Sequence, residues 1–459
     1  MKLTKMSLVA ALVMGSSAFA IDNVEMSGNA NVFYHTQDAA KGYDKISAKD
    51  GTLFDKDSSA ADASVNLLIK ADLAKNDLVK VHTKLGYTAI STLGLENNFV
   101  SNVWGASHSA TTGTDANYAD VLGGAKVENV NYVTEACVGL TLQKGTKSTV
   151  ALGRMELDTP LAFTEKWTIE KNTFEAAVLI NQDVPDTTIV AAYIGNGNGT
   201  ETFGEGNANT VASLDLAYGG VINENGKFTT YGSDGAYAFG VVNNSFKPVT
   251  AQLWYYNVME VATATWLQAD LDASTLGVKG LTAGVQYTTI DIETVAGKVL
   301  AQADTTDRTE AVKVDASAYA VMLGYNVMDM ATVKVAYSQT SEDHSVGFNT
   351  ATAAGTAQTK LYTDAWWNYG RVTEADTSAM SLSVEGAYAG VDLGLYTMRA
   401  EHGDSTAVVN AGRANKKIVE GTVTAAKSFG PLDVTAAYIM TKADNDTTNA
   451  IQAYLTLNF

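Results

Sequence analysis

The last nine residues of the chain alternate strictly between apolar and polar side chains. The apolar positions are Ile451, Ala453, Leu455, Leu457 and Phe459, and the polar positions are Gln452, Tyr454, Thr456 and Asn458. Because successive side chains of a strand point to opposite faces, this pattern predicts a strand with one apolar and one polar face. A terminal strand that ends on an aromatic residue is typical of a transmembrane β-barrel, with lipid outside and water inside. An edge strand of a soluble β-sandwich is the alternative.

The same alternation recurs along the chain. Residues 24–34 show it near the N-terminus, and residues 61–71 and 79–87 show it on either side of a tight turn at 74–77. In this predicted hairpin one face is apolar and the other carries charged side chains, which suits a barrel with a water-filled lumen.

The connections between these segments alternate between short and long. The short ones are 181–186, 243–248, 326–330, 390–392 and 428–433, and the long polar ones are 35–60, 88–124, 195–235, 291–315 and 340–378. Short turns on one side and long loops on the other are typical of outer-membrane barrels. Loops of this length would count against the strand assignment in a soluble domain.

This alternation of apolar-polar segments and connections predicts eighteen candidate strands. They begin near Val24, Ala61, Leu78, Ala125, Ser148, Phe174, Thr187, Ala236, Val249, Val261, Leu281, Ala316, Thr332, Ala379, Leu393, Ile418, Val434 and Ala450. We therefore predict an all-β fold, a transmembrane antiparallel β-barrel of about 18 strands with both termini on the periplasmic side. Sixteen strands is the alternative, and no plug domain is expected.

The first twenty residues have the features of a secretory signal peptide. Lys2 and Lys5 precede an apolar run at 8–14, and Ala18-Phe19-Ala20 is a small-x-small cleavage site. We predict a signal peptide at 1–20 and a barrel domain at 21–459, located in the bacterial outer membrane. The run is shorter than the ~20 residues of a spanning helix. No run of about 18 apolar residues follows, which excludes a helical membrane protein.

Charge narrows the function further. Without Lys2 and Lys5 the chain keeps 29 basic against 50 acidic residues, a net charge of −21. This balance argues against nucleic-acid binding, which needs a basic surface, and it suits a protein that handles cations. The single cysteine, Cys137, leaves no internal disulfide, so stability must come from another source. Backbone pairing around a closed barrel supplies it.

The sequence carries no enzyme motif. There is no Gly-x-Ser-x-Gly elbow, His-Glu-x-x-His or P-loop. Five histidines are scattered without metal-ligand spacing, at His35, His82, His108, His344 and His402. We therefore predict neither an enzyme nor a cofactor. A serine and a histidine brought together only by the fold remain the alternative.

One loop is the candidate constriction. A predicted strand ends at Gly153-Arg154-Met155, and the loop 156–173 that follows carries Glu156, Asp158, Glu165, Lys166, Glu170 and Lys171. A charged loop folded into a barrel narrows the lumen and sets a local field that filters polar solutes.

A basic lumen wall would face this loop. Its candidates are Lys70, Lys80, His82, Lys84 and Arg154. An ordinary solvated face is the alternative for each of them. The face of the strand on which Arg154 lies is ambiguous, because the apolar residues Val150 and Leu152 lie on the same face of the predicted strand.

Four stretches resemble the major outer membrane porin family of Campylobacter and its relatives. They are the leader at 1–12 with Met26-Ser27-Gly28, the segments 172–181 and 185–188, Lys-Pro-Val-Thr-Ala-Gln-Leu-Trp at 247–254, and Lys-Leu-Tyr-Thr-Asp-Ala-Trp-Trp-Asn at 360–368. The resemblance implies an eighteen-stranded trimeric porin with an inward-folded third loop, and a divalent cation such as calcium in the lumen, whose ligands do not map onto this sequence. Gly153-Arg154 also resembles the Gly-Arg that precedes the third loop of many porins, although Met155 stands where Gln is frequent.

The sequence therefore predicts a general diffusion porin for ions and small hydrophilic solutes, mildly selective for cations. The expected partners are outer-membrane lipid and lipopolysaccharide, two further copies in a homotrimer, and the barrel assembly machinery, for which the terminal Phe459 is the signal. A substrate-specific channel is one rival, and it predicts an aromatic track or a basic ladder along the lumen. A structural or adhesive surface barrel with a plugged lumen is the other.

Overall fold

The structure is a computed structural model of the chain. It describes residues 21–38, 52–55, 58–91, 130–166, 169–198, 228–230, 235–259, 261–292, 314–328, 330–349, 358–405, 415–444 and 446–459. The expected signal peptide at 1–20 lies outside the described residues, as does the strand start expected near Ala125.

Long strands account for nearly all of the regular structure. They are β1 (Asp22–Gln37), β2 (Ser59–Lys75), β3 (Val79–Ser91), β4 (Val130–Leu142), β5 (Ser148–Met155), β6 (Phe174–Asn181), β7 (Thr187–Gly197), β8 (Thr229–Thr230), β9 (Ala236–Asn243), β10 (Val249–Val258), β11 (Ala262–Asp272), β12 (Leu281–Ile292), β13 (Val314–Val327), β14 (Ala331–Thr340), β15 (Thr377–Tyr388), β16 (Val391–His402), β17 (Lys417–Phe429), β18 (Leu432–Ala443) and β19 (Asp446–Asn458). The helical elements of the described residues are two 3-10 turns, η5 (Ala273–Leu276) and η7 (Arg371–Thr373). No described helix is long and apolar enough to cross a bilayer.

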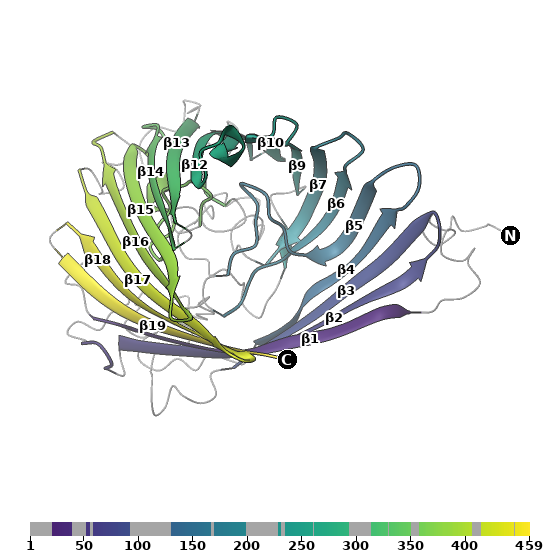
Figure 1. The fold of residues 1–459 in the computed structure, drawn as a ribbon, viewed down its shortest axis with the longest axis horizontal. Coiled ribbons are helices and arrows are strands. Elements are labelled where there is room, and N and C mark those ends of the chain that lie inside the picture. The colour runs from purple at the N-terminus through teal and green to yellow at the C-terminus, as the bar shows by residue number, and fades with distance from the viewer. Residues whose placement is uncertain are drawn as a thin grey trace, which may run out of the picture.

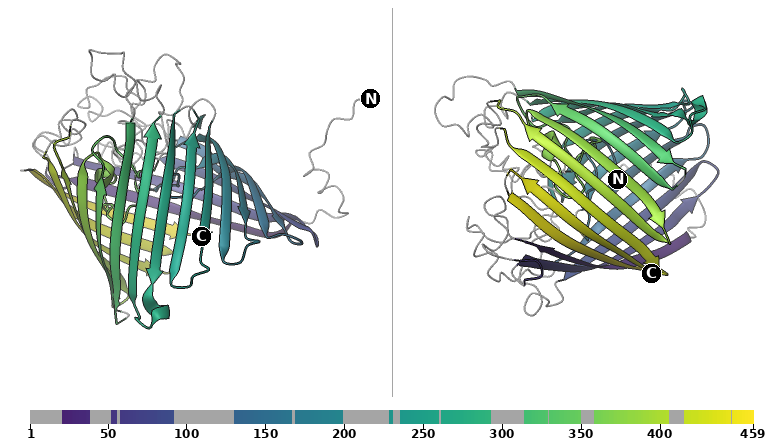
Figure 2. Two further views of the ribbon diagram at one scale, coloured as in Figure 1. Left: turned by 90° about the horizontal axis from the view of Figure 1, so that it is seen from above. Right: turned by 60° about the vertical axis from the view of Figure 1, so that its left-hand side comes forward.

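Each long strand pairs antiparallel with its neighbours in the chain, and the ring closes. β1 pairs with β2 on one side and with β19 on the other, from Asn29 opposite Asn458 to Gln37 opposite Ala450. β7 pairs directly with β9, so the two-residue β8 only extends one end of β7. The result is a closed barrel of eighteen strands (Figure 1; Figure 2). The predicted fold class is confirmed, and eighteen rather than sixteen is the strand number.

The observed strand starts follow the hydrophobic pattern closely. β5, β6, β7, β9, β10 and β12 begin at the expected residues, and the largest difference among the other described starts is at β19, which begins at Asp446 rather than Ala450. The alternation of short and long connections has two exceptions. β10 joins β11 by a tight turn closed by the Val261 N–H on the Val258 carbonyl (3.0 Å), and β18 joins β19 across Asp444.

The two faces of the barrel differ in chemistry. Outward positions carry large, exposed apolar side chains, among them Leu67, Leu253, Val285, Leu323, Val423 and Leu455. At the end of β19, Leu457 and the following Phe459 are exposed, whereas Gln452 on the opposite parity is buried and accepts a hydrogen bond from Tyr454. An apolar outer face of this extent is what a strand needs when lipid surrounds it.

The last residue takes part in closing the ring. The Gly28 N–H donates to the Phe459 carbonyl (2.8 Å), and the Phe459 N–H donates to the Gly28 carbonyl (3.0 Å). A Cβ added to Gly28 would lie 2.6 Å from Cε2 of the Phe459 ring, so the ring packs where only glycine leaves room.

Candidate constriction site

Two loops fold into the barrel from the end opposite Asp22, where β1 begins, and Phe459. The first follows β5, spans 156–173 and is described except at 167–168; the second follows β14, spans 341–376 and is described at 341–349 and 358–376. Figure 1, which looks down the barrel, shows both segments inside the ring of strands. We call them the first and the second inner loop. The inward fold expected for residues 156–173 is present.

The inner loops lie inside because part of the barrel wall is apolar on its inward face. Leu157 and Leu161 of the first loop and Val346, Leu361 and Val372 of the second belong to one buried cluster. The same cluster contains inward-facing wall residues of β6, β7, β9, β10 and β11, namely Val178, Ala192, Ala238, Trp254 and Trp266. Burial of this apolar surface holds both loops in the lumen.

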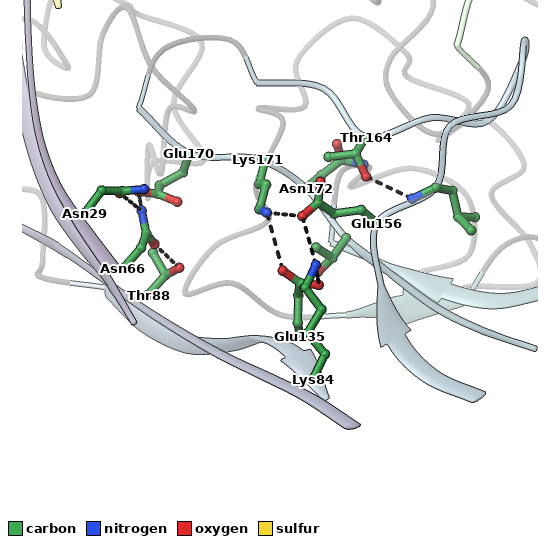
Figure 3. Close-up of polar contacts among 12 residues, drawn as sticks. Asn29, Asn66, Lys84, Thr88, Glu135, Glu156, Thr164, Glu170, Lys171 and Asn172 are labelled. Atoms are coloured by element: carbon green, nitrogen blue, oxygen red, sulfur yellow. Dashed lines mark hydrogen bonds and ion pairs between the residues drawn. The ribbon is translucent and has the colours of Figure 1, made fainter. Parts of the chain in front are cut away.

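Four charged side chains join the first inner loop to the wall (Figure 3). Lys84 of β3 contacts Glu135 of β4, and Lys171 contacts Glu156 within the loop. The two pairs are cross-linked, with Lys171 Nζ 3.4 Å from Glu135 Oε1 and Lys84 Nζ 3.7 Å from Glu156 Oε1. We call these four residues the charge quartet. Its formal charges cancel, so it presents a local field without a net charge.

The quartet keeps Glu156 ionised. Burial raises the pKa of the Glu156 carboxyl, but the hydrogen bond from Lys171 and the charges of Lys171 and Lys84 outweigh it, and the pKa lies below its usual value. Glu135 is almost fully buried, whereas Glu156 remains more than a third exposed. Glu156 is therefore the quartet's carboxylate that a passing solute can reach.

Glu170 anchors the far end of the same loop. Its Oε1 accepts a hydrogen bond from Nδ2 of Asn66 (2.9 Å), and the same Nδ2 also donates to Asn29 (3.0 Å). Asn66 in turn accepts from the Thr88 hydroxyl (Figure 3). Burial raises the pKa of the Glu170 carboxyl. Glu170 therefore fastens the loop to β1, β2 and β3 and is not a pore-facing charge.

Glu165 holds the two inner loops together. It is fully buried, and its Oε1 accepts hydrogen bonds from Nδ2 of Asn349 (2.7 Å) and from the N–H of Gln358 (3.1 Å). Asn349 also bonds the backbone of Phe163 in both directions, donating to its carbonyl (2.8 Å) and accepting from its N–H (3.1 Å). Asp158 pairs with Lys360 nearby. The loops form one arch across the lumen.

The second inner loop has its own anchors on the wall. The buried Glu420 of β17 accepts hydrogen bonds from the backbone N–H groups of Trp366 (3.0 Å), Trp367 (3.0 Å) and Asn368 (2.7 Å). The Tyr362 hydroxyl donates to Asp270 of β11 (2.5 Å). From the sequence, this segment was predicted to lie in a long polar loop, and 360–368 resembles a porin family, but no contact with the wall was predicted. Its anchors lie 52 or more positions away, so no local signal could have identified them.

Asp364 organises the interior of the second loop. It accepts hydrogen bonds from the N–H groups of Thr359 (2.9 Å), Ala365 (3.0 Å) and Gly370 (3.1 Å). Burial outweighs these donors and raises the pKa of its carboxyl to about 7.

Four of the five candidate wall residues lie on inward-facing positions. Lys70 stands opposite Lys84, and His82 stands opposite Asp72. Lys80 pairs with Asp72 at 2.9 Å. They share the parity of Asn66, whose side chain reaches the first inner loop. Lys166 of that loop is exposed. The four wall residues Lys70, Lys80, His82 and Lys84 together form a basic stripe on β2 and β3.

Arg154 takes the other face. Cross-strand pairing sets it opposite Glu175, which shares the parity of the exposed Leu179. Its Nε donates to Glu175 Oε1 (2.7 Å), and its guanidinium lies 4.0 Å from the centre of the Phe228 ring. The expectation that Arg154 lines the lumen is therefore corrected. Its parity with Leu152 is the signal that indicated the outer face.

No three His, Cys, Asp or Glu side chains of the described residues gather closely enough to hold a metal ion. The described His, Cys, Asp and Glu side chains therefore provide no such cluster for the lumen cation that the family resemblance implies.

No protein-family model and no curated protein matches the sequence. Among solved structures, the chain is similar to Pseudomonas aeruginosa OccK1 (OpdK), with a TM-score of 0.65, 12% identity, and coverage of 96% of this chain and 99% of that one. It is also similar to OccK9 (OpdG) of the same organism, with a TM-score of 0.67, 12% identity, and coverage of 96% and 100%. Acinetobacter baumannii OccAB4 matches with a TM-score of 0.64, 10% identity, and coverage of 96% and 100%. At such identities the likeness shows a shared fold.

Proposed function

We propose that the chain is an outer-membrane diffusion channel for ions and small hydrophilic solutes. The observation that carries this proposal is the closed ring, with an apolar outside and a lumen crossed by two inner loops that carry charged side chains. The exposed apolar belt suits lipid, and closure leaves no unpaired strand edge within it. No enzyme activity is part of the proposal.

The arch of the inner loops sets the size of solute that passes. Water-exposed charges beside the arch, chiefly Glu156, Asp158 and Lys166, act on solutes during passage. The chain as a whole has 50 acidic against 31 basic residues, which favours cations. Since the charge quartet is balanced, we expect the preference for cations to be mild.

Liposome swelling tests the size limit. Vesicles that contain the purified protein should swell quickly in arabinose, more slowly in a disaccharide, and not in a large dextran. Reversal potentials under a KCl gradient test the sign of the selectivity. Equal swelling rates for all solutes would contradict the size filter, and a preference for chloride would contradict the charge argument.

A second candidate is a channel selective for small anions. The observation that favours it is the basic stripe of Lys70, Lys80, His82 and Lys84 along two adjacent strands, in which Lys80 is paired with Asp72 and Lys84 with Glu135. One structure of the similar protein OpdK is described as containing vanillate. We would then expect a small aromatic carboxylate such as benzoate to block the current saturably, and substitution of Lys70 by Gln to weaken the block. A linear, unsaturated dependence on benzoate favours the general channel.

Assembly follows from the same proposal. We propose a homotrimer, which predicts conductance insertions in three equal steps. We also propose that the barrel assembly machinery recognises the C-terminal strand through Phe459, whose exposed ring and paired backbone support this role. Deletion of Phe459 should then lower the yield of heat-resistant folded barrel in cells.

A further inference from the structure

The outer surface of β16, β17 and β18 carries a group of basic side chains near the loop end of the barrel. Arg399, Lys417 and Lys442 share the parity of the exposed residues Leu395, Val423 and Met440, so they point outward. Arg399 and Lys442 flank Val419 in one cross-strand row, and Lys417 lies two residues above that row. The right-hand view of Figure 2 brings the outer face of these strands toward the reader.

These three side chains are close enough to act on one ligand. Two strand spacings separate Arg399 from Lys442, which is about 10 Å between their Cα atoms. Glu401 is the acidic residue on the same outward face, and it contacts both Arg399 and Lys417 (3.4 Å). At the rim beside them, Lys416 and Asp444 neutralise each other (2.6 Å). The outward positions described here therefore keep a surplus of positive charge, on a chain whose net charge is −19.

The basic group lies on the loop side of an exposed outer-face aromatic residue, where lipid headgroups are expected. Lys442 stands four residues above the exposed Tyr438 on the same face of β18, which is about 13 Å along the strand. Aromatic residues on the outer face of a barrel mark the boundary between hydrocarbon and headgroups. Basic side chains immediately beyond that boundary meet the phosphate groups of lipids, with which lysine and arginine form charge-assisted hydrogen bonds.

Directly below the basic group the outer face lacks a side chain at Gly421, and we call this open position the hollow. In the row beneath it, Thr397, Gly421 and Met440 stand side by side. A Cβ added to Gly421 would meet one atom within 4 Å, Met440 Cε at 3.8 Å, so the surface there is open. A hollow in an apolar face below a cationic group has the form that a phosphorylated headgroup with an acyl chain would fill.

We infer that Arg399, Lys417 and Lys442 with the hollow at Gly421 form a binding site for a phosphorylated glycolipid of the outer leaflet. The inference rests on the proposed outer-membrane location and adds a specific lipid site to it. The lipid phosphate lies between the three cations, and an acyl chain lies along Gly421.

Binding of bisphosphorylated lipid A to the detergent-purified full chain, measured by native mass spectrometry, tests the site. The triple variant Arg399→Gln, Lys417→Gln, Lys442→Gln should bind at least tenfold more weakly, and so should the unchanged protein with dephosphorylated lipid A. Lys427→Gln is the matched control, because Lys427 also points outward but lies near the opposite end of β17. It should bind like the unchanged protein.

Gly421→Leu is the second variant, which fills the hollow and changes no charge. It should weaken lipid A binding severalfold while single-channel conductance stays unchanged. The inference would be overturned if the triple variant and Lys427→Gln bound lipid A with equal affinity. It would also be overturned if neither dephosphorylation of the lipid nor Gly421→Leu weakened binding. If the protein conducts ions but its affinity for lipid A does not depend on these residues, the lipid site is wrong and the channel proposal stands. If lipid A binds as described but the protein does not conduct, the channel proposal is wrong and the lipid site stands.

Discussion

Glu165 accepts a hydrogen bond of 2.7 Å from Nδ2 of Asn349, a residue 184 positions further along the chain. Both side chains are fully buried, and they join the inner loop after β5 to the inner loop after β14. A loop held only at its two ends could move within the lumen. A loop tied to a second loop, which is itself fastened to Glu420 and Asp270, is fixed from both sides. The described parts of the two loops therefore form one arch that is fastened to the wall at both loops.

The first prediction concerns this tie. Asn349→Ala leaves the Glu165 carboxylate buried with one donor fewer, and a hydrogen bond to a charged group contributes about 1.5–3 kcal/mol. We expect noisier single-channel currents and faster proteolysis of the second inner loop. Asp343→Asn, at an exposed position of the same loop, is the control and should behave like the unchanged protein. Identical current noise in both variants would show that the tie does not fix the arch.

Substitution of an acidic and of a basic residue of the charge quartet should change the ion selectivity in opposite directions. Glu156→Gln leaves Lys84 and Lys171 with one carboxylate, Glu135, so the reversal potential should shift toward anions. Lys84→Met should shift it toward cations. Lys427→Gln, on the outer surface, should not move it. Shifts of the same sign for Glu156→Gln and Lys84→Met would contradict the assignment of the quartet to the ion path.

Asp364 predicts a dependence on pH. Its pKa is raised from 3.8 to about 7 in the folded chain, so the folded state binds this proton more tightly than the unfolded state. Its contribution to stability is full below about pH 3.8 and is lost as the pH rises toward 7. The hydrogen-exchange protection factors of the second inner loop, which are corrected for the intrinsic rise of exchange with pH, should therefore fall across that window. In Asp364→Asn, which cannot ionise, this fall should disappear; if it persists, another group is responsible.

Packing against Gly284 gives a test of the second loop's anchor. A Cβ on Gly284 would overlap the hydroxyl of Tyr362, so Gly284→Ala should displace the Tyr362 bond to Asp270. We expect a lower midpoint of thermal unfolding and a larger conductance, because the loop moves away from the wall. Gly421→Ala is the matched control, since its added methyl meets only Met440 at an ordinary contact distance. Equal effects of both substitutions would point to strand propensity instead of the anchor.

Periodicity predicted the barrel because each strand meets lipid on one side and water on the other, so the two-residue repeat is strong in segments such as 451–459. The inward fold of the loop after β5 was predicted from its charged residues and from the resemblance to the porin family. The pattern of the sequence did not predict the role of each charged residue in that loop. Glu165 and Glu170 are anchors whose partners, Asn349 and Asn66, lie 184 and 104 positions away.

The structure differs from the sequence prediction in two further places, one for a local and one for a long-range reason. Arg154 faces outward, as its parity with Leu152 indicates, and the resemblance of Gly153-Arg154 to other porins pointed the other way. Gly153 itself has φ +121°, a backbone conformation that sequence periodicity does not reveal. The second inner loop depends on Glu420, a carboxylate placed beneath three backbone N–H groups by strands that follow it in the chain.

Single-channel recording of the purified chain in a planar bilayer tests the central claim most directly. If the lumen is an open channel narrowed by a fixed two-loop arch, the protein should insert with a steady, reproducible conductance that is linear in salt concentration. Substitutions that release the arch, such as Asn349→Ala, should change its noise. A folded barrel that inserts and carries no ionic current would contradict the channel, and would favour a plugged barrel with a structural or adhesive role.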